Sequence, residues 1–390
     1  MLKNAEFFVN DRIGMKHSIV SLLLSGLLLN FSFSALGQNV EAKSDAKVWK
    51  LVRENPQKYF PHTVAPGNYS GITRLHDDLY AVVSDKSDSA LYFNFQIQLN
   101  PVTGDLERVA NLGFTEYVDG SEKVSQSPWQ GIQSGFDHEA IAKVSDSTVI
   151  VASEGFYRLK EYPIIKQRDE HSVSSAKRKI TSQLWSQEWS SSDFYPNYVF
   201  ESLAYDSIRH LLWTIPESTL RQDGEPATPQ NGKQNKLRLM CFDGKHQLTS
   251  YAYQMDAPTT NREAQTYVMG VSELCALPDG QLLVLEREAY IPKVKLGAFC
   301  QCKLYVIDPL RGESWKMSES MNQDTPFLKK RLLTEWKTRL GLLDRSFANY
   351  EGMCLGPQLQ DGSQVLILIS DSQDQYAGVL RDWMKTIVIE

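Results

Sequence analysis

Short apolar segments recur along the chain, and a polar or acidic residue stands before and after each of them. Five units share this layout, with apolar runs at residues 79–83, 149–152, 211–215, 282–285 and 365–369. Continuous apolar runs are typical of strands buried on both faces, because a strand with one wet face alternates apolar and polar residues. Turn residues such as Pro278-Asp279-Gly280 join two runs in the manner of a tight hairpin. The pattern predicts an all-β fold made of repeated strand pairs.

A further predicted strand follows each pair, for example at residues 236–243 and 303–308. Units of ~40–50 residues with four strands each are the signature of a β-propeller, in which every blade buries its faces against its neighbours. A spacing of about 60 residues after residue 37 predicts six blades, one of them irregular. We expect strands from both chain ends, at residues 48–52 and 385–389, to close the ring.

The first 37 residues have the pattern of a secretory signal. Basic residues after Met15 precede an apolar run at residues 19–29, and Ala35-Leu36-Gly37 then supplies small residues for a signal peptidase. We expect residues 1–37 to be removed, with Met15 as an alternative start. Residues 38–66 would form an extension with the closing strand, and residues 67–390 the propeller. Polar interruptions make the run a poor membrane span, so we predict an exported protein, periplasmic or secreted, without a membrane span; a short anchor is the alternative.

Acidic residues at the strand ends are the candidate site residues. Four repeats carry a glutamate in the first strand, at steps of 62, 72 and 78 residues: Glu139, Glu201, Glu273 and Glu351. The apolar strands end in a second set of acids: Asp85, Glu154, Glu217, Glu286 and Asp371. A carboxylate at the end of a buried strand must reach water, a cation or a hydrogen-bond network. Because equivalent strand ends meet around a propeller's axis, we expect a ring of carboxylates in a central funnel.

Such a ring favours a hard divalent cation. Carboxylates held close together repel, which raises some of their pKa values or recruits a metal. Oxygen ligands with few His or Cys residues nearby favour Ca²⁺, with Mg²⁺ as the second choice, over zinc. We expect Arg287 to neutralise part of the ring or to hold an anionic substrate group, with His138 and Tyr350 as further candidate substrate contacts. The competing interpretation is structural: the acids accept backbone N–H groups and fix the register of the blades, and His138 and Tyr350 are ordinary buried residues.

Composition and charge narrow the partners. Hydrophobic residues make up 42% of the chain and charged residues 23%, which excludes collagen-like and disordered chains. The net charge is −6 and no stretch is dense in Lys and Arg, which disfavours a nucleic-acid partner. The five cysteines form neither a CxxC pair nor a zinc-binding spacing. We expect a monomer that acts on a small anionic ester.

The ordered motifs resemble a known family. They are the segments 137–142 with 152–154, 272–274 with 283–287, and 349–353 with 368–371. These segments are similar to the phytase-like domain family described as "esterase-like activity of phytase", over roughly residues 67–390. The resemblance implies a periplasmic or secreted propeller with hydrolytic activity on phosphate or other esters.

We therefore predict a metal-dependent ester hydrolase that acts on phosphoesters first and on carboxylic esters or lactones second. In this hypothesis Glu139, Glu201, Glu273 and Glu351 form the catalytic ring with Arg287, and one glutamate accepts a proton from the attacking water. The sequence has neither an Arg-His-Gly-x-Arg motif nor a Gly-x-Ser-x-Gly elbow, which argues against a histidine acid phosphatase and a serine esterase. The alternative is a non-catalytic propeller that binds a ligand or partner and holds a structural Ca²⁺.

Overall fold

The computed structural model describes residues 47–390, except 88–89, 117–135, 165–184, 245 and 376–378. The predicted signal peptide and the start of the N-terminal extension lie outside the described residues. Within the described part of the chain, no helix has the length and apolar character needed to cross a bilayer.

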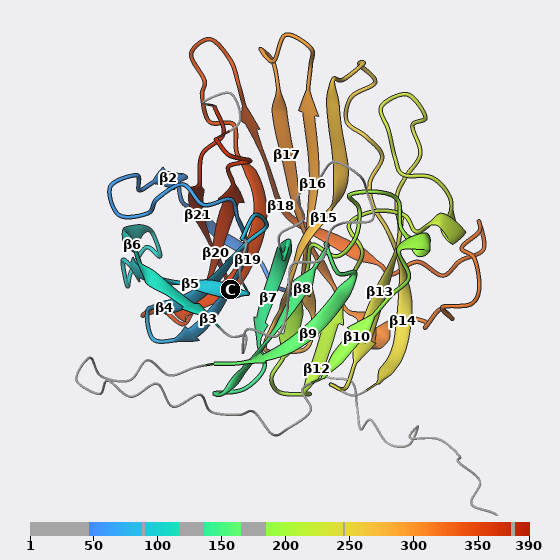
Figure 1. Cartoon of the computed structure of the whole chain (residues 1–390), viewed down its shortest axis with the longest axis horizontal. Helices are drawn as coiled ribbons and strands as arrows, with labels where there is room; N and C mark the ends of the chain where they lie inside the picture. The colour runs from blue at the N-terminus through green and yellow to red at the C-terminus, as the bar shows by residue number, and fades with distance from the viewer. Residues whose placement is uncertain (1–46, 88–89, 117–135, 165–184, 245, 376–378) are drawn as a thin grey trace, which may run out of the picture. The chain divides into compact units, whose positions relative to one another are not determined.

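Five antiparallel sheets form the blades (Figure 1). Blade 1 consists of β3 (Tyr69–His76), β4 (Leu79–Ser84), β5 (Leu91–Leu99) and β6 (Leu106–Glu116), and blade 2 of β7 (His138–Lys143), β8 (Thr148–Ser153), β9 (Arg158–Pro163) and β10 (Ser186–Glu188). Blade 3 consists of β11 (Ala204–Asp206), β12 (Leu211–Thr214), β13 (Lys236–Phe242) and β14 (Gln247–Gln254), and blade 4 of β15 (Thr266–Ala276), β16 (Leu282–Ile291), β17 (Phe299–Ile307) and β18 (Lys330–Arg339). Blade 5 consists of β19 (Asn349–Gln358), β20 (Gln364–Asp371) and β21 (Trp383–Ile389), together with β1 (Leu51–Glu54) and β2 (Lys58–Tyr59). Three short 3₁₀ helices, η1 (Ser191–Asp193), η2 (Arg221–Asp223) and η3 (Pro309–Arg311), complete the assigned elements.

The blades close into a ring. The first strand of each blade contacts the first strand of the next, in the order β3, β7, β11, β15 and β19, and β19 returns to β3. The seam lies in blade 5, where β1 pairs antiparallel with β21 and Leu51 faces Ile389. The prediction that strands from both chain ends close the propeller is therefore confirmed.

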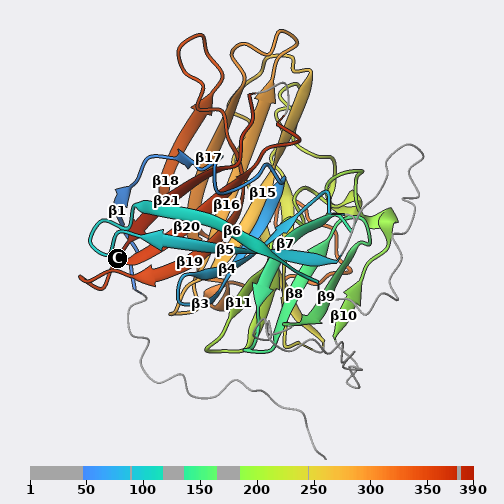
Figure 2. The ribbon, with the colours of Figure 1, turned by 60° about the vertical axis from the view of Figure 1, so that its left-hand side comes forward.

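The predicted number of six blades is wrong: the described residues form five. Each of the five repeats seen in the sequence begins one blade. The long steps between repeats do not contain an extra blade. They contain longer strands, and those of blade 4 are 9 to 11 residues long. Both views show this sheet reaching past its neighbours (Figures 1 and 2).

The hydrophobic core lies between blades. Five clusters of buried side chains each join two successive blades, and one of them packs Leu285 of blade 4 with Leu368 of blade 5. Both leucines are fully buried, as the continuous apolar runs predict. Because the surrounding strands cannot collapse into a void, truncating such a leucine to alanine costs about 2–5 kcal/mol. This packing gives the centre of the ring rigid walls.

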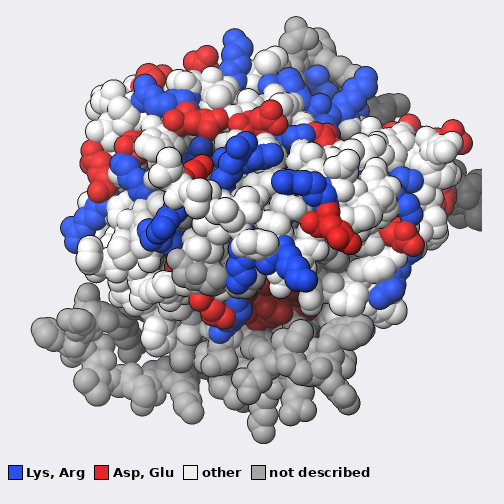
Figure 3. Space-filling view, turned by 90° about the horizontal axis from the view of Figure 1, so that it is seen from above, with Lys and Arg blue, Asp and Glu red and all other residues white. Residues whose placement is uncertain are grey.

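Charged side chains are mixed over the face seen in Figure 3. Lys and Arg side chains alternate there with Asp and Glu and with uncharged residues. That face has no continuous basic surface of the kind that nucleic acids require.

Candidate functional site

The same irregularity occurs at the start of the inner strand in several blades. In blade 2, His138 pairs with Ser153 and Ala140 with Ala152, which leaves Glu139 as an extra residue. Blade 5 repeats this arrangement around Glu351. An extra residue of this kind is a β-bulge, which changes the direction of a side chain and is common next to active sites.

The bulges align the five blades residue by residue. The extra positions are Ser70 in blade 1, Glu139, Ser272 and Glu351, and the bridge between Phe200 and Pro216 places Glu201 at the equivalent position in blade 3. A second set of equivalent positions lies on the neighbouring strand, one residue beyond the partner of the residue that precedes each bulge: Asp85, Glu154, Glu217, Arg287 and Asp371. Blades 1 and 4 have a serine at the first of these positions, and blade 4 alone has a basic residue, Arg287, at the second.

Seven carboxylates and one guanidinium come together at these positions, joined by the carboxylate of Asp137 two residues before the bulge of blade 2, and we call the group the central cluster. Its members are Asp85, Asp137, Glu139, Glu154, Glu201, Glu217, Glu351 and Asp371, with Arg287. Carboxylate oxygens of Glu139, Glu201 and Glu351, from three different blades, lie within 4.8 Å of one another. The sequence therefore predicted correctly that these three glutamates, far apart along the chain, meet.

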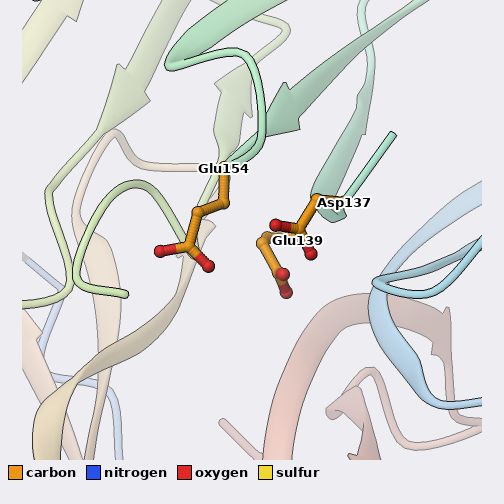
Figure 4. A group of neighbouring side chains, drawn as sticks. All are labelled: Asp137, Glu139 and Glu154. Atoms are coloured by element: carbon orange, nitrogen blue, oxygen red, sulfur yellow. The ribbon is translucent and has the colours of Figure 1, made fainter. Parts of the chain in front are cut away.

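A second triad shares Glu139. Carboxylate oxygens of Asp137, Glu139 and Glu154 also lie within 4.8 Å of one another. Figure 4 shows their carboxylates turned toward a common space, with Asp137 and Glu139 at the start of β7 and Glu154 beyond the end of β8. One oxygen of Glu154 is buried and has no hydrogen-bond partner among the described residues. A cation or water in this space would satisfy it.

Negative charge is in excess in the central cluster. Burial, with repulsion from Glu201 and Asp137, raises the pKa of Glu139 well above its ordinary value. Burial and Asp371 raise the pKa of Glu351 to about 8, although Arg287 opposes the rise. Burial and Asp371 raise the pKa of Asp85 to about 9. Without a further positive charge, several of these groups hold protons at neutral pH.

Arg287 is the charge that the chain itself supplies. Its two terminal nitrogens bind Glu351 and Glu217, and Nη1 also donates to Asn349 Oδ1 at 3.0 Å. The side chain is 4% exposed. A guanidinium held on both sides by carboxylates fixes their orientation and leaves little of itself for a substrate.

Glu273 does not join the ring. It stands one position past the bulge of blade 4, where the other blades have Gly71, Ala140, Ser202 and Gly352. A shift of one residue along a strand turns the side chain to the other face. Its Oε1 accepts hydrogen bonds from the backbone N–H groups of Leu203, at 3.0 Å, and Leu274, at 2.9 Å, and Met353 N–H also bonds to the carboxylate. Glu273 thus ties together the inner strands of blades 3, 4 and 5.

Glu286 lies in a separate group, which we call the lysine-paired cluster: Asp256, Glu286, Lys303 and Lys330, with Tyr253 and Tyr305. Lys330 Nζ lies 2.6 Å from Glu286 and 2.8 Å from Asp256. Although burial opposes the effect, Lys303, Lys330 and Tyr305 hold the pKa of Asp256 below its usual range. These acids are neutralised by the chain itself.

His138 and Tyr350 point into the core between blades. His138 packs between Phe136 and Tyr162, and burial lowers its pKa to about 3. Tyr350 packs edge-on against Trp336, and its hydroxyl donates to Gln57 Oε1 at 3.0 Å. The structure does not bring either side chain to the carboxylates of the central cluster.

Sequence reasoning did not single out two members of the site. Asp137 has a φ of 51°, like the equivalent Asn68 of blade 1 at 49°. Among residues other than glycine, Asp and Asn tolerate this left-handed conformation best. An Asp or Asn two residues before the bulge is therefore the sequence pattern that could have identified Asp137 as a site residue. Lys86 follows Asp85 directly and lies half-exposed, 3.7 Å from Asp85 and 3.3 Å from Asp374.

Comparison with known proteins supports the family assignment. A family model described as "Phytase-like: Esterase-like activity of phytase" matches residues 65–373. No curated protein matches the sequence. Among solved structures, a duf4221 family member from Bacteroides vulgatus is 11% identical, with 88% of this chain and 98% of that chain covered and a TM-score of 0.34.

Two further structures give similar values. The Dos1 propeller is 10% identical, with coverage of 82% and 68% and a TM-score of 0.27. Hsv2 from Kluyveromyces lactis is 9% identical, with coverage of 69% and 86% and a TM-score of 0.26. These scores are too low to support a functional argument. The family match extends over all five inner strands and every carboxylate of the central cluster, and the chain belongs to the phytase-like family, "esterase-like activity of phytase".

Proposed function

We propose that this protein is a divalent-cation-dependent ester hydrolase that works at the central cluster, with phosphoesters as its favoured substrates. The observation that carries the proposal is the meeting of Glu139, Glu201 and Glu351 from three blades within 4.8 Å. Membership of the phytase-like family supports an ester substrate. We also propose that the protein is exported, on the signal-like pattern of residues 1–37.

The donor set fits a hard cation. All candidate ligand atoms are carboxylate oxygens, which suit Ca²⁺ or Mg²⁺. Glu139, Glu201 and Glu351 would hold the cation, and the unpartnered oxygen of Glu154 marks an adjoining position within the second triad. A bound divalent cation would stabilise the negative charge that develops on a substrate oxygen.

Three residues of the chain take the remaining roles. Glu154 accepts a proton from the attacking water, since it keeps an oxygen without a partner among the described residues. Arg287 acts as a positioning residue, because it holds Glu217 and Glu351. Lys86, half-exposed next to Asp85, attracts the anionic group of the substrate.

Metal analysis and hydrolysis assays on the same variants test this assignment. Purified protein would be assayed with a chromogenic phosphomonoester, phosphodiester and short acyl ester, with calcium and with chelator. Glu201→Gln should lose both the cation and the activity, whereas Glu154→Gln should retain a cation and lose activity. The matched control is Glu188→Gln, an exposed glutamate on β10.

Two results would overturn the proposal. Full activity in Glu201→Gln and Glu154→Gln would remove the central cluster from the reaction. A bound cation without hydrolysis of any of the esters would favour the alternative, a binding propeller with a structural ion.

A further inference from the structure

The end of blade 4 exposes four large aliphatic side chains. Val294 is 82% exposed, Leu342 80% and Leu296 50%, and Leu343 is fully exposed. Single exposed aliphatics are ordinary on a protein surface, but a group of four on neighbouring turns marks an interaction site. We call residues 292–298 and 340–346 the blade 4 tip.

The two turns of the blade 4 tip lie side by side. Gly297 N–H donates to Leu340 O at 2.8 Å, and Leu340 N–H donates to Ala298 O at 2.9 Å. Within the turns, Lys295 N–H donates to Pro292 O at 2.8 Å and Gly341 N–H to Asp344 O at 2.6 Å. The backbone is thus internally bonded and holds the aliphatic side chains outward. Both ribbon views show the sheet of blade 4 projecting past the other blades at this end (Figures 1 and 2).

Basic residues stand next to these aliphatics in the sequence. Lys293 and Lys295 alternate with Val294 and Leu296 in the first turn, and Arg339 and Arg345 flank the second. Asp344 is the acidic residue of the two turns. The tip is therefore positive in a chain whose net charge is −6, and this local charge is complementary to an anionic surface.

We propose that the blade 4 tip docks this protein on an anionic lipid bilayer. Protruding aliphatic side chains enter the boundary between headgroups and acyl chains, while neighbouring lysines and arginines remain at the level of the anionic headgroups. A bilayer accepts a projecting turn without a complementary pocket, whereas a protein partner must supply one. The proposal does not depend on the central cluster or on its chemistry.

Vesicle co-sedimentation of the whole protein tests this proposal. The protein should bind vesicles of phosphatidylcholine mixed with phosphatidylglycerol more strongly than vesicles of phosphatidylcholine alone. Replacing both leucines, Leu342→Ser with Leu343→Ser, should lower the affinity for mixed vesicles by roughly tenfold or more. Lys293→Gln with Lys295→Gln should weaken binding to mixed vesicles only. Ile208→Ser, at a 63% exposed isoleucine in blade 3, is the matched control and should bind like the parent protein.

Three outcomes would overturn it: no binding to either vesicle, equal binding by the parent and the double-leucine variant, or a dimer in size-exclusion chromatography that the double-leucine variant abolishes. The last would make the tip a contact between copies of this chain. Since Leu342, Leu343, Lys293 and Ile208 are exposed and Lys295 is half-buried, the variants should unfold at the temperature of the parent protein, which circular dichroism checks.

Discussion

The central cluster and the lysine-paired cluster both gather acids from more than one blade, yet they are neutralised in different ways. In the lysine-paired cluster, Lys303 and Lys330 meet Asp256 and Glu286, so two positive groups balance two negative ones. In the central cluster, eight carboxylates share Arg287, with Lys86 beside Asp85.

In the function that we propose, the lysine-paired cluster is structural and the central cluster is reactive. A balanced cluster has a counter-charge within the chain for each of its acids, so it needs no cation from outside. An unbalanced one either keeps protons on its carboxylates or takes up a cation, and both states are ready for chemistry. The raised pKa of Glu351 and the lowered pKa of Asp256 express this contrast, and Glu286 stands between them, because burial raises its pKa while Lys330 opposes the rise.

Removing one carboxylate from the central cluster tests the contrast most strongly. Glu351→Gln should lower calcium affinity and ester hydrolysis at least ~100-fold, because a ligand oxygen and its charge are lost. Isothermal titration and initial rates measure the two effects. Asp256→Asn, the matching change in the lysine-paired cluster, should leave both within about twofold. Equal losses in the two variants would show that the clusters do not differ in the way we describe.

The second prediction concerns pH. Burial raises the pKa of Asp137 to about 6 and that of Glu351 to about 8. At pH values between the ordinary carboxyl range and these raised values, the metal-free native state therefore binds more protons than the unfolded chain. Stability is then greatest at the acidic end and is lost as the pH rises through those values. The melting temperature of chelated protein should fall by about 5 °C from pH 5 to pH 8, and calcium should reverse the trend at pH 8. A melting temperature that rises over this interval in chelator would contradict the excess of negative charge.

Glu273 gives the third prediction. Glu273→Gln should lower the free energy of unfolding by about 1–3 kcal/mol, because an amide keeps one accepting oxygen where the buried carboxyl group, which backbone N–H groups of three blades bond, has two. Chemical denaturation measures this loss. The folded variant should keep its calcium affinity, unlike Glu351→Gln, and a loss of calcium binding would return Glu273 to the metal site.

The smallest effect is expected in the lysine-paired cluster. Asp256→Asn leaves Lys303 and Lys330 with less negative charge nearby, in a setting that is partly exposed to solvent. The free energy of unfolding should fall by about 1 kcal/mol. Denaturation in high salt should narrow the gap between variant and parent, since salt screens exposed charges. A gap independent of salt would mean that the lost hydrogen bond from Tyr305 dominates.

The sequence predicted the fold class, the closing strands and the meeting of three glutamates, because strand repeats and their acidic ends are local patterns. It misplaced Glu273, since a bulge of one residue decides which side chain turns inward and leaves little trace in spacing. It also could not separate Glu286 from the ring. Lys330, the partner of Glu286, lies 44 residues away along the chain, and only folding brings the two together.

The seam between β1 and β21 makes assembly of the ring depend on the last residues of the chain. Leu51 pairs with Ile389 across this seam, so two segments far apart along the chain must meet before the ring closes. A chain that lacks β21 therefore cannot close the ring through this pairing. Loss of the final strand would leave β1 and β20 with unsatisfied edges, and such a truncated product would be a substrate for proteases.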